Sequence, residues 1–341
     1  MRGYDYGTLV YPPIVYCLDT QKNCFKVKGM RITLLSSVAV LLSFSVASGS
    51  SYANAIDYRT FEEMFDEPVT VGATGTPQRI SDVAVNMTVL TEEEIRRIPA
   101  KMIPDLLRYI PGVNVRQVSP NHYEVSIRGY NTPAQQRLLV LIDGRQVYQG
   151  FYGLTNWNAI PVSIDEIKQI EVIKGPNTAL YGFNATSGVV NIITKNPKFE
   201  DYNAVQVSGG NRDYGQASVS ETFQGEWGGF RLSAGGQGWE EAYKSGSLRY
   251  NHIHEPANAY NVWGKGIAQI NIDEYTDLNL EYSYSKSDHN AQLITIFDSV
   301  AEYANIMWSG KIDIDHDTDN WGKWEVIAYR NNSATDDKLY M

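Results

Sequence analysis

Cysteine is almost absent from this chain of 341 residues. Its two cysteines, Cys17 and Cys24, both precede an apolar segment that has the character of a secretion signal. If export removes that segment, no cysteine remains. The fold must then rest on packing and sheet hydrogen bonds, without disulfides.

The expected signal peptide occupies residues 30–55. A basic residue follows Met30, the run from Ile32 to Ala47 is apolar, and Ala53-Asn54-Ala55 provides a small-residue cleavage pattern. A transmembrane anchor is the alternative, but the run is short and rich in serine for a membrane span. We therefore expect cleavage near Ala55. Residues 1–29 resemble neither a signal nor a domain, so we expect a misassigned extension, with Met30 as the true start.

Clusters of basic residues are also lacking. The chain holds 29 Lys and Arg against 39 Asp and Glu, which gives a formal net charge of -10. A surface that binds nucleic acid needs grouped lysines and arginines, so we exclude nucleic acid as a partner. The sequence also shows no catalytic triad, metal-ligand spacing or nucleotide loop. We therefore expect no enzyme and no cofactor.

Aromatic residues and glycine are abundant, with 23 Tyr, 7 Trp and 28 Gly, which favours sheets and membrane interfaces over helix bundles. Two regions differ in pattern. Residues 67–197 mix signals for short helices and strands, which predicts a small α+β domain. Residues 202–341 show strand alternation nearly throughout.

Capping and proline signals predict three short helices in the first region. Thr91 and Glu94 form a capping box that opens a helix stopped by Pro99. A second helix is expected from Pro104 to Ile110. Ser163 and Glu166 repeat the capping box ahead of a third.

The main strand of this region is predicted at Leu138–Ile142, a continuous apolar run that ends in the turn Asp143-Gly144. Such a run indicates a strand that is buried on both faces. Further strands are expected at Val125–Arg128, Gln169–Lys174 and Val189–Thr194.

The second region alternates with period two. Leu278, Leu280, Tyr282 and Tyr284 face one way, and the polar residues between them face the other. A soluble β-sandwich would alternate similarly. Charges and small residues on the polar face favour a wet lumen. Connections that are short at 273–274 and 317–320 but long at 240–259 and 288–304 favour an outer-membrane barrel.

We expect about seven antiparallel transmembrane strands, centred near residues 206, 219, 234, 267, 281, 311 and 326. A barrel that can hold a domain inside has about 22 strands and needs roughly 400 residues. The expected barrel is therefore incomplete.

Four motifs in the first region closely resemble, in the same order, the plug domain of the TonB-dependent outer-membrane receptors. They are Asp105–Val113, Ser126–Gly129, Val140–Val147 and, most strongly, Ile164–Lys195. The resemblance implies a plug at residues 67–197 and a partial β-barrel at 202–341, which resembles the family only in pattern.

Within these motifs we expect Gly175 and Pro176 to turn the chain into a short helix at Asn177–Leu180, and Gly182 and Gly188 to permit tight packing. The full set of expected plug positions is Gly129, Asp143, Gly144, Glu171, Gly175, Pro176, Tyr181, Gly182, Gly188 and Asn191.

Two cations of the motifs, Arg128 and Lys174, are candidates for a lock between plug and barrel. The resemblance implies arginines at both positions, facing acidic residues of the barrel. Lys174 departs from that pattern and cannot make a bidentate carboxylate contact. The alternative is that both are ordinary solvated charges.

An extended segment ahead of the plug is the TonB contact in this family. Within residues 56–71 the best candidate comprises Glu67, Pro68, Val69, Thr70 and Val71. Such a strand can add to the edge of a partner's sheet. The equal alternative is a plain first strand of the plug.

The resemblance implies an outer-membrane receptor that takes up a scarce ligand, energised through the periplasmic protein TonB. A ferric siderophore is favoured, with cobalamin, haem or a sugar as alternatives. Two other classes remain open: a non-transporting truncated fragment, and a soluble binding module that uses the plug alone.

Two further patterns were given little weight. Asp313, Asp315, Asp317 and Asp319 resemble a calcium loop but lack its glycine and its final glutamate. His252 and His254 lie in an expected loop and are treated as solvated.

Overall fold

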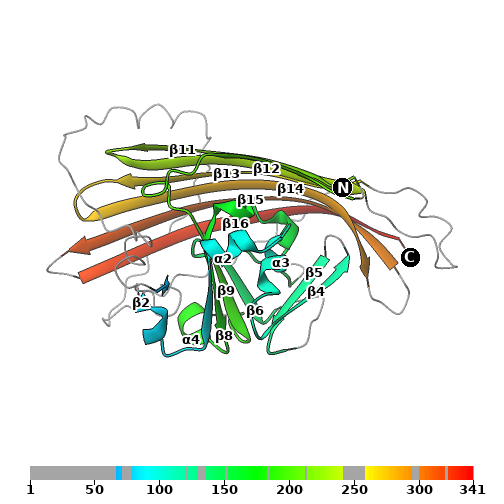
Figure 1. Ribbon diagram of the computed structural model, residues 1–341, viewed down its shortest axis with the longest axis horizontal. Coiled ribbons are helices and arrows are strands. Elements are labelled where there is room, and N and C mark those ends of the chain that lie inside the picture. Colours follow the sequence, from blue (N-terminus) through cyan, green and yellow to red (C-terminus); the bar gives the residue numbers. More distant parts are fainter. Residues whose placement is uncertain are drawn as a thin grey trace, which may run out of the picture.

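The computed structural model divides into a small mixed domain and a long arched sheet (Figure 1). It describes residues 67–70, 78–119, 122–129, 136–149, 153–182, 184–211, 213–240, 258–293, 299–318 and 322–340. The expected signal peptide, the upstream extension and the two loop histidines lie outside these residues. We call the described residues up to 197 the plug, and we call the long sheet the wall sheet.

The plug is built on a five-stranded sheet in the order β3-β8-β9-β6-β7. Its strands are β3 (Met87–Thr91), β8 (Ile167–Lys174), β9 (Gly188–Thr194), β6 (Leu138–Ile142) and β7 (Arg145–Gln146). Strands β6 and β9 run parallel, and every residue of both is buried. This confirms the strand predicted from the continuous apolar run.

Two small sheets and several short helices complete the plug. The paired strands are β1 (Val69–Thr70) with β2 (Gln78–Arg79), and β4 (Val113–Ser119) with β5 (His122–Ile127). The helical elements are η1 (Ile80–Asp82), α2 (Glu92–Arg97), α3 (Ile103–Leu107), η2 (Trp157–Ala159), η3 (Ile164–Glu166) and α4 (Thr178–Tyr181).

Local sequence explains where these helices begin. The predicted capping box at α2 is confirmed, because the Glu94 N–H donates to Thr91 Oγ1 and the Thr91 N–H donates to Glu94 Oε2. The second box is also present at Ser163 and Glu166, but the expected helix is only the single turn η3. The helix does not continue because the chain enters β8 directly after this turn, and burial of that apolar strand stabilises the fold more than further helical turns would.

The wall sheet has seven antiparallel strands in chain order, as predicted. They are β10 (Ala204–Gly209), β11 (Gly215–Gly225), β12 (Gly228–Glu240), β13 (Asn258–Asn271), β14 (Thr276–Leu293), β15 (Ser299–Thr318) and β16 (Gly322–Tyr340). The expected long loop at 288–304 is wrong over most of its length. Asp288 pairs with Ala304, and pairing continues to Leu293 and Ser299, because ladder hydrogen bonds hold these strands even where their residues are polar.

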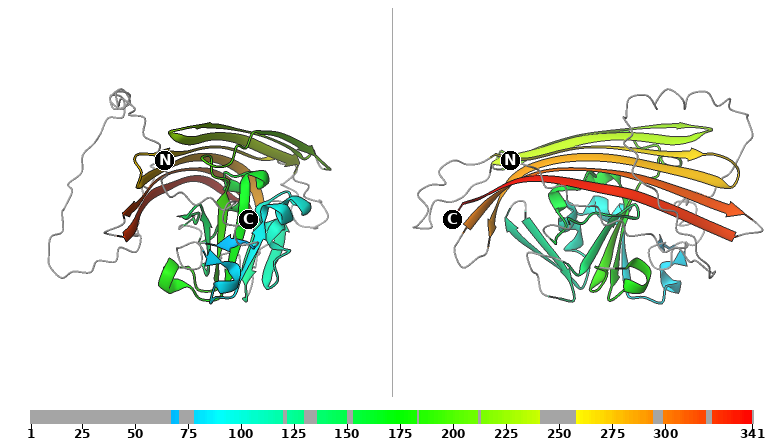
Figure 2. Two further views of the ribbon diagram at one scale, coloured as in Figure 1. Left: turned by 60° about the vertical axis from the view of Figure 1, so that its left-hand side comes forward. Right: turned by 180° about the vertical axis from the view of Figure 1, so that it is seen from behind.

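The wall sheet arches over the plug on one side only, as two further views show (Figure 2). On β14 the polar residues Glu281, Ser283 and Ser285 are buried, whereas Tyr282 and Tyr284 on the opposite face are exposed. The alternation was predicted correctly. The polar face, however, is covered by the plug and is not the wet surface that was expected.

Within the described part of the chain, none of the helices has the length and apolar character needed to cross a membrane.

Candidate functional site

The plug meets the wall sheet at the turn between β6 and β7. The apolar run of β6 ends at Asp143, where φ is +48°, and Gly144 follows with φ +80°. Aspartate tolerates this left-handed conformation better than most residues, and glycine adopts it freely. The turn therefore places Asp143 and Arg145 against the polar face of the wall sheet.

Asp143 joins three parts of the molecule. Its carboxylate accepts hydrogen bonds from the Thr194 N–H at 2.8 Å and from Lys265 Nζ, on β13, at 3.0 Å. Its carbonyl accepts from Lys311 Nζ, on β15, at 2.5 Å. Burial alone would raise the pKa of Asp143. The two ammonium groups and the Thr194 hydrogen bond outweigh it and lower the pKa to about 2.

Among the described residues, Arg145 forms the most deeply buried ion pair between the plug and the wall sheet. Its Nη2 lies 2.9 Å from Glu281 Oε1, and each side chain is only 4% exposed. Its Nη1 donates to Asn331 Oδ1 at 3.0 Å. Such a pair specifies one orientation, because losing either partner leaves an uncompensated buried charge. A cavity of about 20 Å³, enough for a water molecule, adjoins Arg145 between the plug and Ser283 and Ser309.

A second attachment lies at η3, where Glu166 is buried. Its carboxylate accepts hydrogen bonds from Ser220 on β11, at 2.6 Å, and from Ser233 on β12. Directly after the plug, Lys198 Nζ lies 3.4 Å from Asp277 on β14. The plug is thus held to strands from β11 to β16 by polar contacts.

Three of the expected plug positions meet inside the plug. Glu171 Oε2 accepts from Asn191 Nδ2 at 3.0 Å, and Glu171 Oε1 accepts from Gln169 Nε2 at 3.0 Å. Burial, followed by the charge of Glu171, raises the pKa of Tyr181. These residues therefore stabilise β8 and β9 and do not face the wall.

The candidate TonB contact is described from Glu67 to Thr70. Val69 and Thr70 are fully buried, and β1 pairs with β2. Gln169 Nε2 also donates to the Val69 carbonyl at 2.9 Å. This segment can pair with a partner strand only after it leaves these contacts. Val71 lies outside the described residues.

The structure brings the two lock candidates close together within the plug. Arg128 is exposed with φ +51°, and Lys174 Nζ donates to Thr88 Oγ1 at 2.8 Å. Burial and repulsion from Arg128 lower the pKa of Lys174. Among the described residues of β10–β16, no carboxylate forms an ion pair with either cation.

The motif glycines act for different reasons. A Cβ at Gly188 would lie 2.5 Å from the Ile173 carbonyl oxygen, which confirms the expected close packing. At Gly182 the same expectation is wrong, because a Cβ would meet nothing within 4 Å; the φ of +76° is what requires glycine. Gly129, Gly175 and Pro176 lie at the ends of β5 and β8, as expected.

Sequence reasoning missed Arg145, Glu166 and Glu281 as attachment residues. Arg145 could have been predicted from its position, because it is a charged residue directly after the turn that ends a doubly buried strand. Glu281 gave no comparable signal, since it is separated from Arg145 by 136 positions.

Known proteins resemble this chain in both the plug and the wall sheet. Residues 79–189 match the family model described as TonB-dependent Receptor Plug Domain. A vitamin B12 transporter, BtuB, of Vibrio vulnificus is 30% identical over 266 residues, which cover 74% of this chain and 42% of that protein. BtuB of Photobacterium profundum is 35% identical over 162 residues, 47% of this chain and 26% of the relative. The chain thus spans less than half the length of these relatives.

Solved structures share the fold of both regions. The alcaligin outer-membrane receptor FauA of Bordetella pertussis has a TM-score of 0.60 at 17% identity, over 79% of this chain and 42% of that one. The ferric yersiniabactin uptake receptor FyuA of Yersinia pestis has a TM-score of 0.58 at 16% identity, over 74% and 41%. The chain therefore belongs to the TonB-dependent receptors, with their plug domain followed by seven antiparallel strands of a barrel-type sheet.

Proposed function

We propose that this protein is an outer-membrane receptor that takes up a scarce metal-chelate ligand and is energised through TonB. The observation that carries the proposal is the attachment of the plug, through Arg145 and Asp143, to the inner face of a sheet whose outer face is apolar. Val205 and Val207 on that outer face are 78% and 80% exposed. An apolar outer face and a polar inner face suit a barrel wall in lipid. A plug held there by polar contacts must shift before a ligand passes.

Cobalamin is the ligand class that we place first. The relatives at 30% and 35% identity are vitamin B12 transporters by name. The siderophore receptors share only 16% or 17% identity, which supports the fold and not the ligand. A ferric siderophore, favoured by the family resemblance, is the second arm of the test.

Uptake by whole cells tests this proposal. The full chain is expressed in a Gram-negative host whose own cobalamin and siderophore receptors are deleted. We expect accumulation of radiolabelled cyanocobalamin that stops when the host's TonB is deleted. Uptake of a ferric siderophore instead would contradict cobalamin as the ligand but would support the transport function. Uptake of neither would overturn transport.

The TonB contact is proposed at Glu67–Val71, after release from β2 and Gln169. Removal of residues 1–55 would leave no cysteine, so Thr70→Cys provides a single thiol. We expect it to form a disulfide with a cysteine placed in the periplasmic part of TonB, more strongly when ligand is present. Thr178→Cys, on exposed α4, is the matched control. Equal cross-linking of both variants would favour a plain first strand.

Export is the remaining part of the proposal. We expect the protein in the outer-membrane fraction, with Ile56 as its first residue after cleavage near Ala55. N-terminal sequencing of that fraction checks both points. A retained peptide from residues 30–55 would contradict them.

A further inference from the structure

A buried guanidinium lies on the inner face of the wall sheet without a partner. Arg231 on β12 is only 1% exposed, and its Nε and Nη1 donate no hydrogen bond. No carboxylate among the described residues forms an ion pair with it. Arginine stays charged in proteins, and a buried charge is costly unless an opposite charge offsets it. The position of Arg231 therefore favours an anionic partner.

Alternation on β12 fixes the face on which Arg231 lies. Arg231 and Ser233 are both buried, whereas Leu232 between them is 51% exposed on the outer face. Ser233 pairs with Ser220 of β11, and Arg231 pairs with Thr222. The two pairs form neighbouring rows on the inner face, about 7 Å apart along the strands.

The plug places a carboxylate on one of these rows. Glu166 in η3 is buried and accepts hydrogen bonds from Ser220 and Ser233, so it lies on the serine row, next to the row of Arg231. A hydrogen bond between two charged groups is stronger than one from a neutral hydroxyl. A shift of the plug by one row would therefore exchange two serine partners for a stronger one.

Arg231 lies on the side toward which the plug would be pulled. It is closer than Ser233 to the short connection at residues 226–227, between β11 and β12. The proposed TonB contact includes β1, which pairs with β2. Strand β2 lies nearer than β4 and β5 to the end of the wall sheet that carries the short connections (Figure 1). A pull on this segment would move η3 from the serine row toward Arg231.

We infer that Arg231 is a positioning residue that receives the Glu166 carboxylate when the plug shifts by one row. The inference rests on the proposed transport function, because only a plug that moves needs a second position. The plug is held at this point by Ser220 and Ser233 before the shift and by Arg231 after it. The exchange lets the attachment open without leaving the Glu166 charge buried and unpaired.

Uptake by whole cells measures the role of Arg231, with the full chain in the receptor-deleted host. The probe is radiolabelled cyanocobalamin, or a ferric siderophore if the parent takes up that ligand instead. At saturating probe, Arg231→Gln should slow uptake at least about fivefold, and Arg231→Lys, which keeps the charge, should slow it less. The probe concentration for half-maximal uptake should stay within about twofold, because Arg231 does not hold the ligand.

The outcomes separate this inference from the proposed function. Uptake by the parent that Arg231→Gln leaves unchanged would overturn the role of Arg231 and keep the transport function. No uptake by the parent would overturn the transport function, and the inference with it.

A cycle of variants shows whether Arg231 acts through Glu166. In the Glu166→Gln background, Arg231→Gln should slow uptake further by less than about twofold, because the carboxylate that Arg231 would receive is already gone. Asp165→Asn is the matched control, since Asp165 lies in the same turn η3. In that background Arg231→Gln should keep its full effect. Equal effects in both backgrounds would contradict the pairing with Glu166.

Stability separates a positioning role from a structural one. Arg231→Met removes a buried charge that has no partner, so the urea midpoint of unfolding in micelles should stay the same or rise. Arg145→Met leaves Glu281 buried without its partner and should lower the midpoint. A lower midpoint in Arg231→Met would mean that Arg231 is already paired before the plug shifts, and would overturn the inference.

Discussion

The plug and the wall sheet bury opposite kinds of side chain. Strands β6 and β9 of the plug are buried at every residue and are almost wholly apolar. On β14 of the wall sheet, serines and Glu281 are buried while tyrosines are exposed. The plug is therefore stabilised by an apolar core of its own, whereas its contact with the wall is ionic and hydrogen-bonded.

This difference bears on the proposed transport, in which the plug would have to shift before a ligand passes. An apolar core resists unfolding because unfolding would expose its apolar surface to water. A polar interface depends instead on a few directional contacts, and each costs much less to exchange for water. The contrast separates what keeps the plug folded from what keeps it in place.

The largest effect is expected where the wall loses a buried charge. Glu281→Ala leaves Arg145 buried without its carboxylate and should lower the free energy of unfolding by about 3–5 kcal/mol. Urea unfolding in micelles, followed by tryptophan fluorescence, measures the change. Glu221→Ala, an exposed glutamate on β11, should change it by less than about 0.5 kcal/mol. Similar losses of unfolding free energy in both variants would contradict the distinction between the buried and the exposed face of the wall sheet.

The plug core gives the next largest effect. Ile170 on β8 is fully buried, so Ile170→Ala should lower the free energy of unfolding by about 2–5 kcal/mol. Val207→Ala, at an 80% exposed position on β10, should cost about 0.5 kcal/mol or less. The same urea titration compares them. A larger cost at Val207 would mean that the outward face is packed in the folded protein.

Acid should weaken the polar interface before the core. Because the folded state lowers the pKa of Asp143 from 3.8 to about 2, the stability that it contributes is fully present above pH about 4. It is lost as the pH falls toward 2, by about 2 kcal/mol in all. Unfolding free energies measured across this range should show the loss in the parent but not in Asp143→Asn. Asp82→Asn, at an exposed site, should keep it; an unchanged slope in Asp143→Asn would contradict the assignment.

The smallest effect concerns a helix end within the plug. Thr91→Ala removes the hydroxyl that caps α2 and should cost about 1 kcal/mol. Thr91→Ser keeps the hydroxyl and should cost less. Thermal unfolding compares the two variants, and equal losses would assign the effect to the lost methyl group.

Local pattern was enough to predict much of this fold. The apolar run at Leu138–Ile142 and the capping box at Thr91 depend on neighbouring residues only, and both are confirmed. Alternation placed all seven strands of the wall sheet. It failed around Asp288, where polar residues continue the strands and no alternation marks them.

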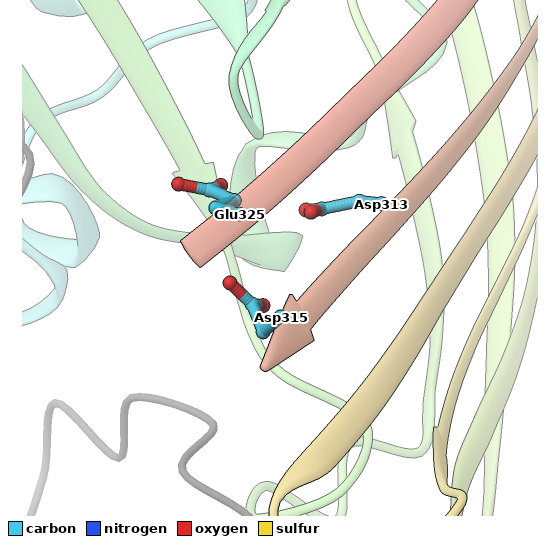
Figure 3. A group of neighbouring side chains, drawn as sticks. All are labelled: Asp313, Asp315 and Glu325. Atoms are coloured by element: carbon cyan, nitrogen blue, oxygen red, sulfur yellow. The ribbon is translucent and has the colours of Figure 1, made fainter. Parts of the chain in front are cut away.

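Contacts between segments that lie far apart in the chain could not be predicted from the sequence. Arg145 meets Glu281, and Glu166 meets Ser220, only because the plug folds against the wall sheet. Asp313, Asp315 and Asp317 resemble part of a calcium loop in sequence, but they lie in strand β15. Asp313 and Asp315 meet Glu325 because strand register, and not spacing along the chain, brings them together (Figure 3).

A double-mutant cycle across the Arg145–Glu281 pair tests the central claim most directly, namely that a buried ionic contact holds the plug to the wall. The cycle compares Arg145→Met, Glu281→Leu and the double variant by their free energies of unfolding. We predict that each single change costs about 3–5 kcal/mol while the double variant costs much less, because no unpaired charge remains buried. Additive losses, with no coupling between the two positions, would contradict the account.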